Sequence, residues 1–439
     1  MRTLMKPHAT ATRGHALRGA VLGIVLGLVL TACTFSVRDY PTEAKAPEFG
    51  ALGLPLVAWE GGPAYWNQFP KAKAGGWTDP SFFPIVAWYN GVSDEKEVKF
   101  DKSLGINTYI GMSDTLDASL LDEAGVFWIG RALNETFTAE SKSWVGYILD
   151  DEVDGRFEPK EGRAHLQEIK DQVPDGLFSY ANFTYMVLEN DLPRDASEKY
   201  INDYTDAVSV DKYWYSIPHC SNEPYRDVSL VPVDAASCRS SSSYGKTMDA
   251  LRMRDAVDGK LQPLWQFIEN MGGTDNEAAF TNYIQPDQLR GAVMNSIIHE
   301  ARGILYFNQS FAGPCKGSNV FRLDQVVPNF CGAAQVDAAK QVNNEIHRLA
   351  PVLNTQSLEF GFGKDLDTML KVSNGDAYIF SMLSPGSRPG KRQFTLPEGV
   401  SGRNVEVLFE SRNLEVDSHG RFTDTFEGES TYHIYKVKL

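Results

Sequence analysis

Two glutamates lie at the ends of short apolar runs of the kind that form buried strands. Glu152 follows the run 144–149, and Glu269 follows the run 264–268. One carboxylic acid can protonate a leaving oxygen while a second carboxylate attacks carbon or activates water, and this is the chemistry of glycosidic bond cleavage. If both runs belong to one parallel barrel, the two glutamates lie at the same mouth.

Eight short apolar runs alternate with polar, helix-like segments between residues 55 and 350. Continuously apolar runs are typical of parallel strands that are covered on both faces. We therefore predict a (β/α)8 TIM barrel over residues 55–350, with Glu152 after strand four and Glu269 after strand seven. A doubly wound open sheet is the alternative, but no glycine-rich phosphate loop follows any run. The predicted strands are 83–89, 106–112, 126–130, 144–149, 177–182, 207–214, 264–268 and 304–307.

The pattern changes after residue 350. Short runs of alternating polarity follow one another, separated by turn residues such as Asn374-Gly375-Asp376. This pattern predicts a small antiparallel β-sandwich over residues 351–439. Its predicted strands are 368–372, 377–382, 392–396, 405–411 and 432–437.

The first 32 residues have the features of an export signal. Four basic residues and no acidic one accompany an apolar stretch at 21–30, which is too short to span a bilayer. The following Leu30-Thr31-Ala32-Cys33 resembles a bacterial lipobox, which implies cleavage before Cys33 and lipid on its sulfur. We expect an exported, lipid-anchored protein at the cell membrane, with residues 33–54 as a tether. Ordinary secretion with a chance cysteine is the alternative.

The net charge of the chain argues against one class of partner, nucleic acids. The net charge is −15, and removal of the four basic residues of segment 1–32 would make it −19. A chain this acidic repels phosphate backbones, so we expect no nucleic acid partner.

Four cysteines remain after Cys33. An even number in an exported protein favours two disulfides, and proximity predicts the pairs Cys220–Cys238 and Cys315–Cys331. A zinc site is the alternative, but no CxxC or HxxxH spacing supports it. We predict neither a metal nor an organic cofactor.

The order of these features resembles the clan-A glycoside hydrolases. Members of that superfamily carry the acid/base after strand four and the nucleophile after strand seven. Segment 146–152, Gly-Tyr-Ile-Leu-Asp-Asp-Glu, and segment 301–307, Ala-Arg-Gly-Ile-Leu-Tyr-Phe, are similar to β-galactosidase-like members. The resemblance implies a retaining glycoside hydrolase with Glu152 as acid/base, Glu269 as nucleophile and a carbohydrate substrate. The chain departs from the family at Asp151, where asparagine is usual, so contact with a sugar 2-hydroxyl would differ.

Other residues near the predicted strand ends are candidates for binding substrate. The resemblance implies a tyrosine that donates to the nucleophile, with Tyr213 the first choice and Tyr215 the second. The faces of Trp88 and Trp214 can stack on sugars, although core packing is the alternative for both residues. The asparagines can bind hydroxyls, and the acids around Glu152 suit a group that keeps its proton. The candidates are Asp151, Tyr213, Tyr215, Trp88, Trp214, Asn182 and Asn308.

Three rival functions make different demands on the sequence. A non-catalytic carbohydrate-binding lipoprotein on the same barrel would keep the aromatics without needing two facing glutamates. A metal-dependent hydrolase needs a histidine-rich mouth, yet only His219 is close to a predicted strand end. A serine hydrolase is disfavoured because Gly-x-Ser-x-Gly is absent.

Overall fold

The computed structural model describes residues 48–88, 91–190, 192–216, 230–234, 236–272, 282–311 and 313–439. All of them belong to one compact unit, Pro47–Leu439. The predicted export signal, the predicted lipidation site Cys33 and most of the predicted tether lie outside the described residues.

Eight parallel strands form a closed barrel in sequential order, so the prediction of a (β/α)8 barrel is confirmed. Each predicted run overlaps one strand, and the strands are almost wholly buried, as continuous apolar runs require. The first and last strands pair in parallel, which excludes the open sheet. The strands are β1 (Ile85–Trp88), β2 (Thr108–Ile110), β3 (Phe127–Ile129), β4 (Trp144–Asp151), β5 (Phe178–Thr184), β6 (Ala207–Asp211), β7 (Leu264–Glu269) and β8 (Gly303–Phe307).

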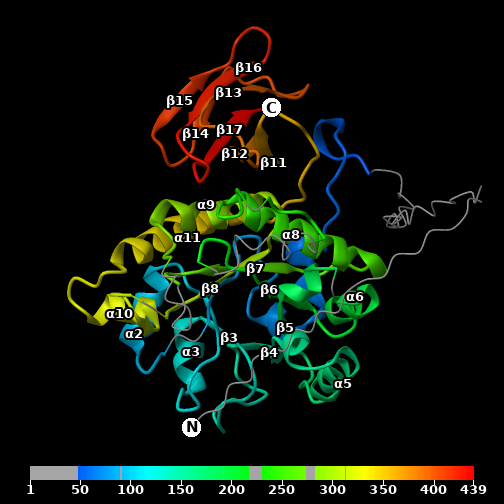
Figure 1. Ribbon diagram of the computed structural model, residues 1–439, viewed down its shortest axis with the longest axis vertical. Helices are drawn as coiled ribbons and strands as arrows, with labels where there is room; N and C mark the ends of the chain where they lie inside the picture. The colour runs from blue at the N-terminus through cyan, green and yellow to red at the C-terminus, as the bar shows by residue number, and fades with distance from the viewer. Residues whose placement is uncertain are drawn as a thin grey trace, which may run out of the picture. The chain divides into compact units, whose positions relative to one another are not determined.

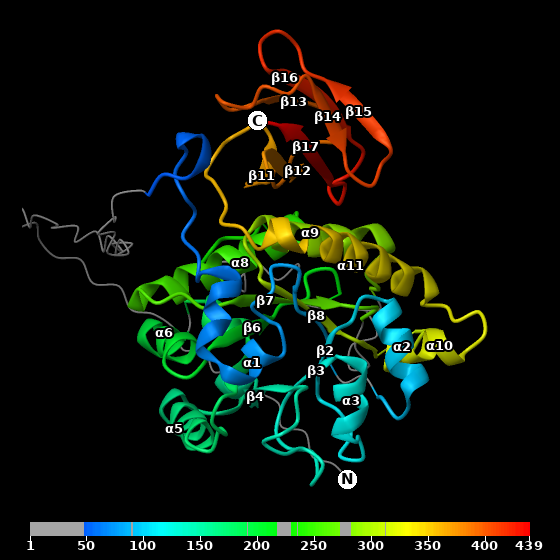
Figure 2. The ribbon, with the colours of Figure 1, turned by 180° about the vertical axis from the view of Figure 1, so that it is seen from behind.

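Helices lie outside the ring of strands, as Figures 1 and 2 show from opposite sides. Local sequence explains where several begin: the Asp94 side chain caps α2 by accepting from the Glu97 amide, and Pro159 and Pro286 occupy first helical positions. The α-helices are α1 (Pro70–Ala74), α2 (Glu95–Ser103), α3 (Ala118–Ala124), α4 (Val153–Arg156), α5 (Pro159–Lys170), α6 (Arg194–Asn202), α8 (Ser242–Asp255), α9 (Pro286–Ile298), α10 (Val320–Val326) and α11 (Ala333–Leu353). Short 3-10 helices are η1 (Ala51–Gly53), η2 (Gly62–Gln68), η3 (Tyr185–Leu188) and η5 (Ala256–Asp258), and β9 (Gln309–Ser310) pairs with β10 (Gly317–Ser318).

The C-terminal domain consists of antiparallel strands, as predicted. A five-stranded sheet of order β11-β12-β17-β14-β15 accompanies the pair β13-β16. Its core includes Phe394 and Phe422, whose rings stack with centroids 4.6 Å apart. The strands are β11 (Leu366–Ser373), β12 (Asp376–Leu383), β13 (Gly390–Thr395), β14 (Asn404–Val407), β15 (Arg412–Glu415), β16 (Arg421–Phe426) and β17 (His433–Lys438).

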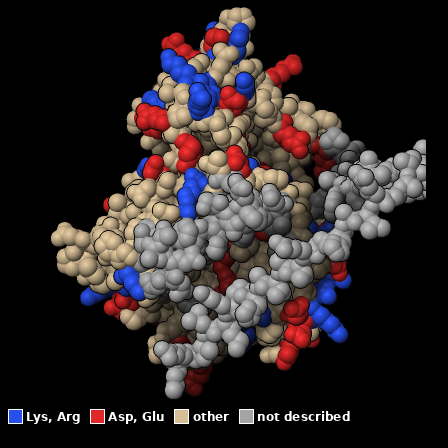
Figure 3. All heavy atoms as spheres, in the orientation of Figure 1, with Lys and Arg blue, Asp and Glu red and all other residues tan. Residues whose placement is uncertain are grey.

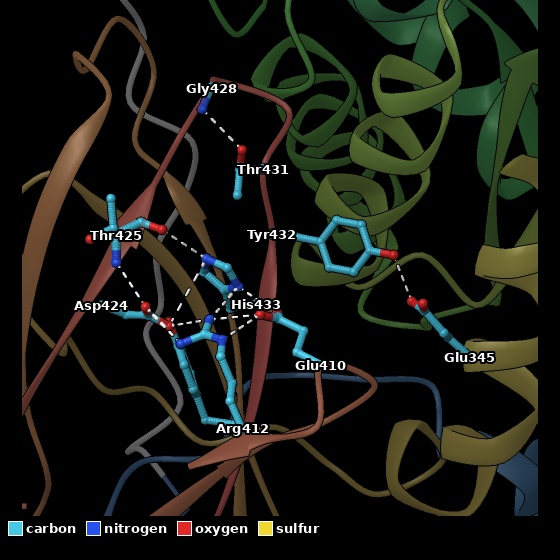
Figure 4. Close-up of polar contacts among 10 residues, drawn as sticks. Glu345, Glu410, Arg412, Asp424, Thr425, Gly428, Thr431, Tyr432 and His433 are labelled. Atoms are coloured by element: carbon cyan, nitrogen blue, oxygen red, sulfur yellow. Dashed lines mark hydrogen bonds and ion pairs between the residues drawn. The ribbon is translucent and has the colours of Figure 1, made fainter. Parts of the chain in front are cut away.

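Two strands of this domain were not predicted. The predicted run 405–411 ends as a strand at Val407, and β15 and β16 follow it. Polar and charged residues dominate β15 and β16, so their apolar signal is weak. Side-chain pairing fixes them instead: the Arg412 guanidinium donates to both Asp424 carboxylate oxygens, at 2.9 and 2.7 Å, beside His433 (Figure 4).

Two segments lie near the predicted domain limits. Helix α11 continues through Pro351 to Leu353, three residues beyond the predicted end of the barrel. Phe49 forms a bridge with Pro55, and Leu52 and Leu54 pack against the core of the C-terminal domain. The described end of the predicted tether is therefore part of the folded unit.

The disulfide prediction is confirmed for one pair. Cys315 and Cys331 are bonded, with Cα atoms 5.6 Å apart. Cys238 is also disulfide-bonded, whereas its predicted partner Cys220 lies outside the described residues.

Two further properties concern the described part of the chain. Its helices include none that is long and apolar enough to cross a membrane. On the face of the molecule in Figure 3, acidic and basic side chains of the C-terminal domain are interspersed rather than gathered by sign.

Candidate active site

A row of polar side chains crosses the mouth of the barrel on β4, β5 and β6. The register pairs Asp151 with Asn182 and Asn182 with Ser209. The Asn182 amide nitrogen donates to Asp151 at 2.9 Å, and the Ser209 hydroxyl donates to the Asn182 amide oxygen at 2.7 Å. Asn182 is 1 % exposed, so its two bonds fix the Asp151 carboxylate at the end of β4.

Glu152 leaves strand β4 in a left-handed backbone conformation. Its φ is 51° and its ψ is 36°, a region that a residue with a Cβ enters at a cost in free energy. The Glu152 amide donates to the Asn182 carbonyl at 2.9 Å, which holds the turn in place. Strain of this kind is concentrated at functional sites, and here it falls on a half-buried glutamate directly after β4.

Asp211, at the end of β6, contacts Glu152. Burial, the charge of Asp151 and the contact with Glu152 raise the pKa of Asp211 well above its usual range. Burial also raises the pKa of Asp151 to about 6. This direction favours the protonated form of Asp211, which lies in contact with the Glu152 carboxyl.

The acid that contacts Glu152 is not one of its neighbours in the sequence. Asp150 pairs with Arg156 at 2.5 Å and with His165 at 2.6 Å, so its carboxylate already has partners. Asp211, which is 59 positions from Glu152 in the chain, is the acid that contacts Glu152.

Glu269 is 1 % exposed and accepts hydrogen bonds from three residues. Its Oε1 accepts from the amides of Tyr215 and Ser216, at 3.0 and 3.1 Å, and from the Ser216 hydroxyl at 3.3 Å. The Tyr244 hydroxyl is 2.7 Å from both Glu269 oxygens. Burial raises the pKa of Glu269, while these donors act to lower it. Among the described residues, Oε2 has only the Tyr244 contact, so it is the less occupied oxygen.

Tyr213 connects the two acidic groups. Its hydroxyl donates to Asp211 at 2.9 Å, and its ring packs against Phe307 with centroids 5.3 Å apart. Burial and the charges of Asp211, Asp151 and Glu269 raise the pKa of Tyr213 well above its usual range. The ends of β4, β6 and β7 meet at one mouth of the closed parallel barrel, so Glu152, Asp211 and Glu269 lie at the same end of it.

The expected tyrosine donor to Glu269 was wrong. The Tyr213 hydroxyl bonds Asp211, and the Tyr215 hydroxyl bonds Glu429 at 2.6 Å, so only the main chain of Tyr215 reaches Glu269. Tyr244, on α8, supplies the hydroxyl instead. No strand signal marks Tyr244, because it reaches the mouth from a helix.

Trp88 lines a pocket of about 350 Å³ at the ends of β1 to β4. Asp151 and Trp128 line the same pocket, so an aromatic side chain and a carboxylate border one concave space. Trp88 itself is 3 % exposed and packs edge-on against Phe267.

Two other candidate substrate-binding residues, Trp214 and Asn308, do not line the pocket of Trp88 and Asp151. Trp214 is 2 % exposed, and its indole donates to Thr247 of α8 at 2.9 Å, which fits the alternative of core packing. Asn308 is buried, and its side-chain oxygen accepts from the Phe321 amide in the first turn of α10.

Asn270 was not assigned a role from sequence. It follows Glu269 and is fully buried, yet neither polar atom of its side-chain amide has a hydrogen-bond partner within the described residues. Buried amides are normally bonded, and ligand hydroxyls are one source of the missing partners. Within the same described residues, no group of three or more His, Cys, Asp or Glu side chains is arranged to hold a metal ion.

The chain was compared with known proteins. No family model and no curated protein sequence matches it. Solved structures do align with it over most of its length. A GH30 endoxylanase from Clostridium papyrosolvens aligns at 11 % identity and a TM-score of 0.44, over 82 % of this chain and 97 % of the other.

Two further alignments have the same character. An Anoxybacillus alpha-amylase aligns at 10 % identity and a TM-score of 0.47, over 82 % of this chain and 98 % of the other. A family 51 alpha-L-arabinofuranosidase from Bifidobacterium longum aligns at 10 % identity and a TM-score of 0.47, over 82 % and 96 %. With TM-scores below 0.5, the function has to be argued from the side chains at the barrel mouth.

Proposed function

We propose that this protein is a retaining glycoside hydrolase in which Glu269 is the nucleophile and Glu152 the acid/base. The observation that carries the proposal is the donor arrangement at Glu269: an almost fully buried carboxylate at the end of β7 that accepts from Tyr215, Ser216 and Tyr244. Asp211, whose pKa is raised, contacts Glu152; Glu152 follows β4, and Asp211 ends β6, the strand beside β7. The reaction needs an ionised nucleophile and a protonated acid at one mouth, and the hydrogen-bond donors on Glu269 favour its ionised form.

In the first step, Glu269 Oε2 attacks the anomeric carbon. The bond from that carbon to the leaving oxygen breaks, and Glu152 transfers the proton of the Asp211–Glu152 pair to that oxygen. Oε1 stays bonded to its donors throughout, which fixes the direction of the attacking oxygen. The product of this step is a covalent glycosyl ester on Glu269.

In the second step, Glu152 accepts a proton from water as the water attacks the same carbon. The ester bond breaks, Glu269 leaves as a carboxylate, and the sugar keeps its original anomeric configuration. This mechanism requires the two carboxyl groups to be about 5–5.5 Å apart when substrate is bound.

The substrate site extends over the pocket of Trp88 and Asp151. The pocket combines an apolar ring with a carboxylate, which suits the C–H faces and hydroxyls of a sugar. Asn182 acts through Asp151, whose carboxylate it orients. The unpaired amide of Asn270 lies next to Glu269 in sequence and provides two more polar atoms for hydroxyls.

Hydrolysis of a panel of aryl glycosides and bacterial and plant polysaccharides tests the proposal. We expect at least one substrate to be cleaved, with the first-formed product in the same anomeric configuration when it is followed by NMR. Inversion would reject the retaining mechanism. Saturable binding without any cleavage would instead identify a non-catalytic carbohydrate-binding protein.

Tyr244→Phe should shift the pH dependence of kcat/KM. The Tyr244 hydroxyl stabilises the ionised form of Glu269, so its loss should raise the Glu269 pKa by about one unit. A larger share of the enzyme is then protonated at acidic pH, and the acidic limb should move to higher pH. Tyr306→Phe is the control, because it removes a buried hydroxyl that bonds Asn343 at 2.7 Å. An acidic limb that is the same in Tyr244→Phe as in the wild type would contradict the role of Tyr244.

The enzyme is exported and held at the membrane by lipid on Cys33. The support is the basic, then apolar segment that ends in Leu30-Thr31-Ala32-Cys33. Labelled palmitate should be incorporated into the wild type and absent from Cys33→Ala. Release of the wild-type protein without label would contradict the anchor.

A further inference from the structure

The loop between β16 and β17 reaches the segments that surround Glu269. Within this loop, Glu429 Oε1 accepts from the Tyr215 hydroxyl at 2.6 Å. Its Oε2 accepts from the Ser241 amide at 2.8 Å. The Ser241 and Tyr215 hydroxyls are 2.9 Å apart, so Glu429 closes a small hydrogen-bonded ring with both residues.

Both segments that Glu429 holds also hold Glu269. Tyr215 donates its amide to Glu269, and Ser241 directly precedes helix α8, which carries Tyr244 in its first turn. The rings of Tyr215 and Tyr244 stack with centroids 5.6 Å apart, and the Tyr215 amide also lies 3.1 Å from the Tyr244 hydroxyl. The Glu429 carboxylate thus bonds Tyr215, whose amide donates to the proposed nucleophile, and Ser241, which lies three residues before Tyr244.

We propose that Glu429 is a positioning residue for Glu269, through which the C-terminal domain forms part of the active site. Glu429 does not reach the reacting atoms. It fixes the Tyr215 main chain and the beginning of α8, and these in turn set the donors on Glu269. This inference rests on the proposed function for its effect on catalysis, but the geometry also predicts an effect on Glu269 that is independent of turnover.

The negative charge of Glu429 and its positioning of the donors have opposite effects on the Glu269 pKa, which makes the inference testable. If Glu429 acted only as a nearby negative charge, removing it would lower the Glu269 pKa, because like charges disfavour ionisation. If Glu429 positions the donors, removing it weakens hydrogen bonds to the ionised form and raises the Glu269 pKa. Glu429→Gln separates the two effects, because it removes the charge and keeps an oxygen acceptor.

A matched control is available in the same loop. Figure 4 shows Tyr432 pointing from the C-terminal domain to Glu345 of α11, where its hydroxyl donates at 2.6 Å. Tyr432→Phe removes a hydrogen bond between the same two domains that has no connection to the donors on Glu269. A general loosening of the domain contact would appear in this variant as well.

The experiment measures the Glu269 pKa by NMR in protein labelled with ¹³C at glutamate carboxyls, with the signal assigned through Glu269→Gln. We expect Glu429→Ala to raise this pKa by about one unit. Glu429→Gln should change it less, and Tyr432→Phe should leave it at the wild-type value. An unchanged or lowered pKa in Glu429→Ala, or an equal rise in Tyr432→Phe, would overturn the inference.

Kinetics on a substrate that the wild type cleaves give the second readout. Glu429→Ala should lower kcat about tenfold with little change in KM, because the nucleophile is misaligned while the sugar contacts remain. If the wild type cleaves nothing, the proposed function fails while the NMR result still decides the role of Glu429. If the wild type is active and Glu429→Ala equals it in kcat and in Glu269 pKa, the role of Glu429 fails alone.

Discussion

Glu269→Ala should lower kcat by about 10⁴-fold or more on every substrate that the wild type cleaves. The covalent step needs this carboxylate, and no neighbouring group takes its place, since its partners Tyr215, Ser216 and Tyr244 are donors. Added azide should partly restore cleavage of an activated aryl glycoside, because the small anion fits the space left by the side chain. The product should be a glycosyl azide of inverted configuration, since azide then attacks in a single displacement.

Glu269→Gln distinguishes catalysis from a structural role of this buried residue. Glutamine keeps an oxygen for the amides of Tyr215 and Ser216, so the fold should be retained, with a thermal midpoint close to that of the wild type. Activity should nevertheless be lost, because the neutral amide is a poor nucleophile. A folded Glu269→Gln protein with wild-type activity would rule out the proposed mechanism.

Glu152→Ala should produce a loss that depends on the leaving group. For glycosides with poor leaving groups, kcat/KM should fall by about 10³-fold, since these groups depend on proton donation. For dinitrophenyl glycosides, kcat/KM should fall less than about tenfold, because such groups leave without a proton. The measurement is a plot of log kcat/KM against leaving-group pKa, which should be steep in the variant and shallow in the wild type.

Asp150→Asn is the control for Glu152→Ala. Asp150 lies two residues away, but it pairs with Arg156 and His165 and not with the Asp211–Glu152 pair. The Asp150→Asn substitution should change kcat/KM by a similar small factor for every leaving group. A uniform loss in Glu152→Ala, without dependence on the leaving group, would assign proton donation to another residue.

The barrel was predictable because the composition of each short segment indicates a buried strand without reference to the rest of the chain. Each strand is a continuous apolar run, and burial on both faces requires that composition, so all eight strands were found. The C-terminal strands β15 and β16 were missed for the opposite reason. Their polar side chains are held by partners such as the Arg412–Asp424 pair, and a pairing between strands is not visible in either one alone.

The site was predictable only where strand position determines it. The ends of β4 and β7 identified Glu152 and Glu269, and the same rule applied to β6 would have identified Asp211. Tyr244 reaches Glu269 from a helix, and Glu429 acts from the other domain. These two contacts arise from tertiary packing, for which the sequence around each residue contains no signal.

Covalent trapping tests the central claim most directly. A 2-deoxy-2-fluoro glycoside of the sugar that the enzyme cleaves, with a dinitrophenyl leaving group, should form the glycosyl ester rapidly and release it slowly. Mass spectrometry of the digested protein should then find one added fluoroglycosyl group on the peptide that contains Glu269, and none in Glu269→Gln. A label on Glu152 or Asp211, or complete turnover of the reagent with inverted configuration, would contradict the assignment of Glu269 as the nucleophile.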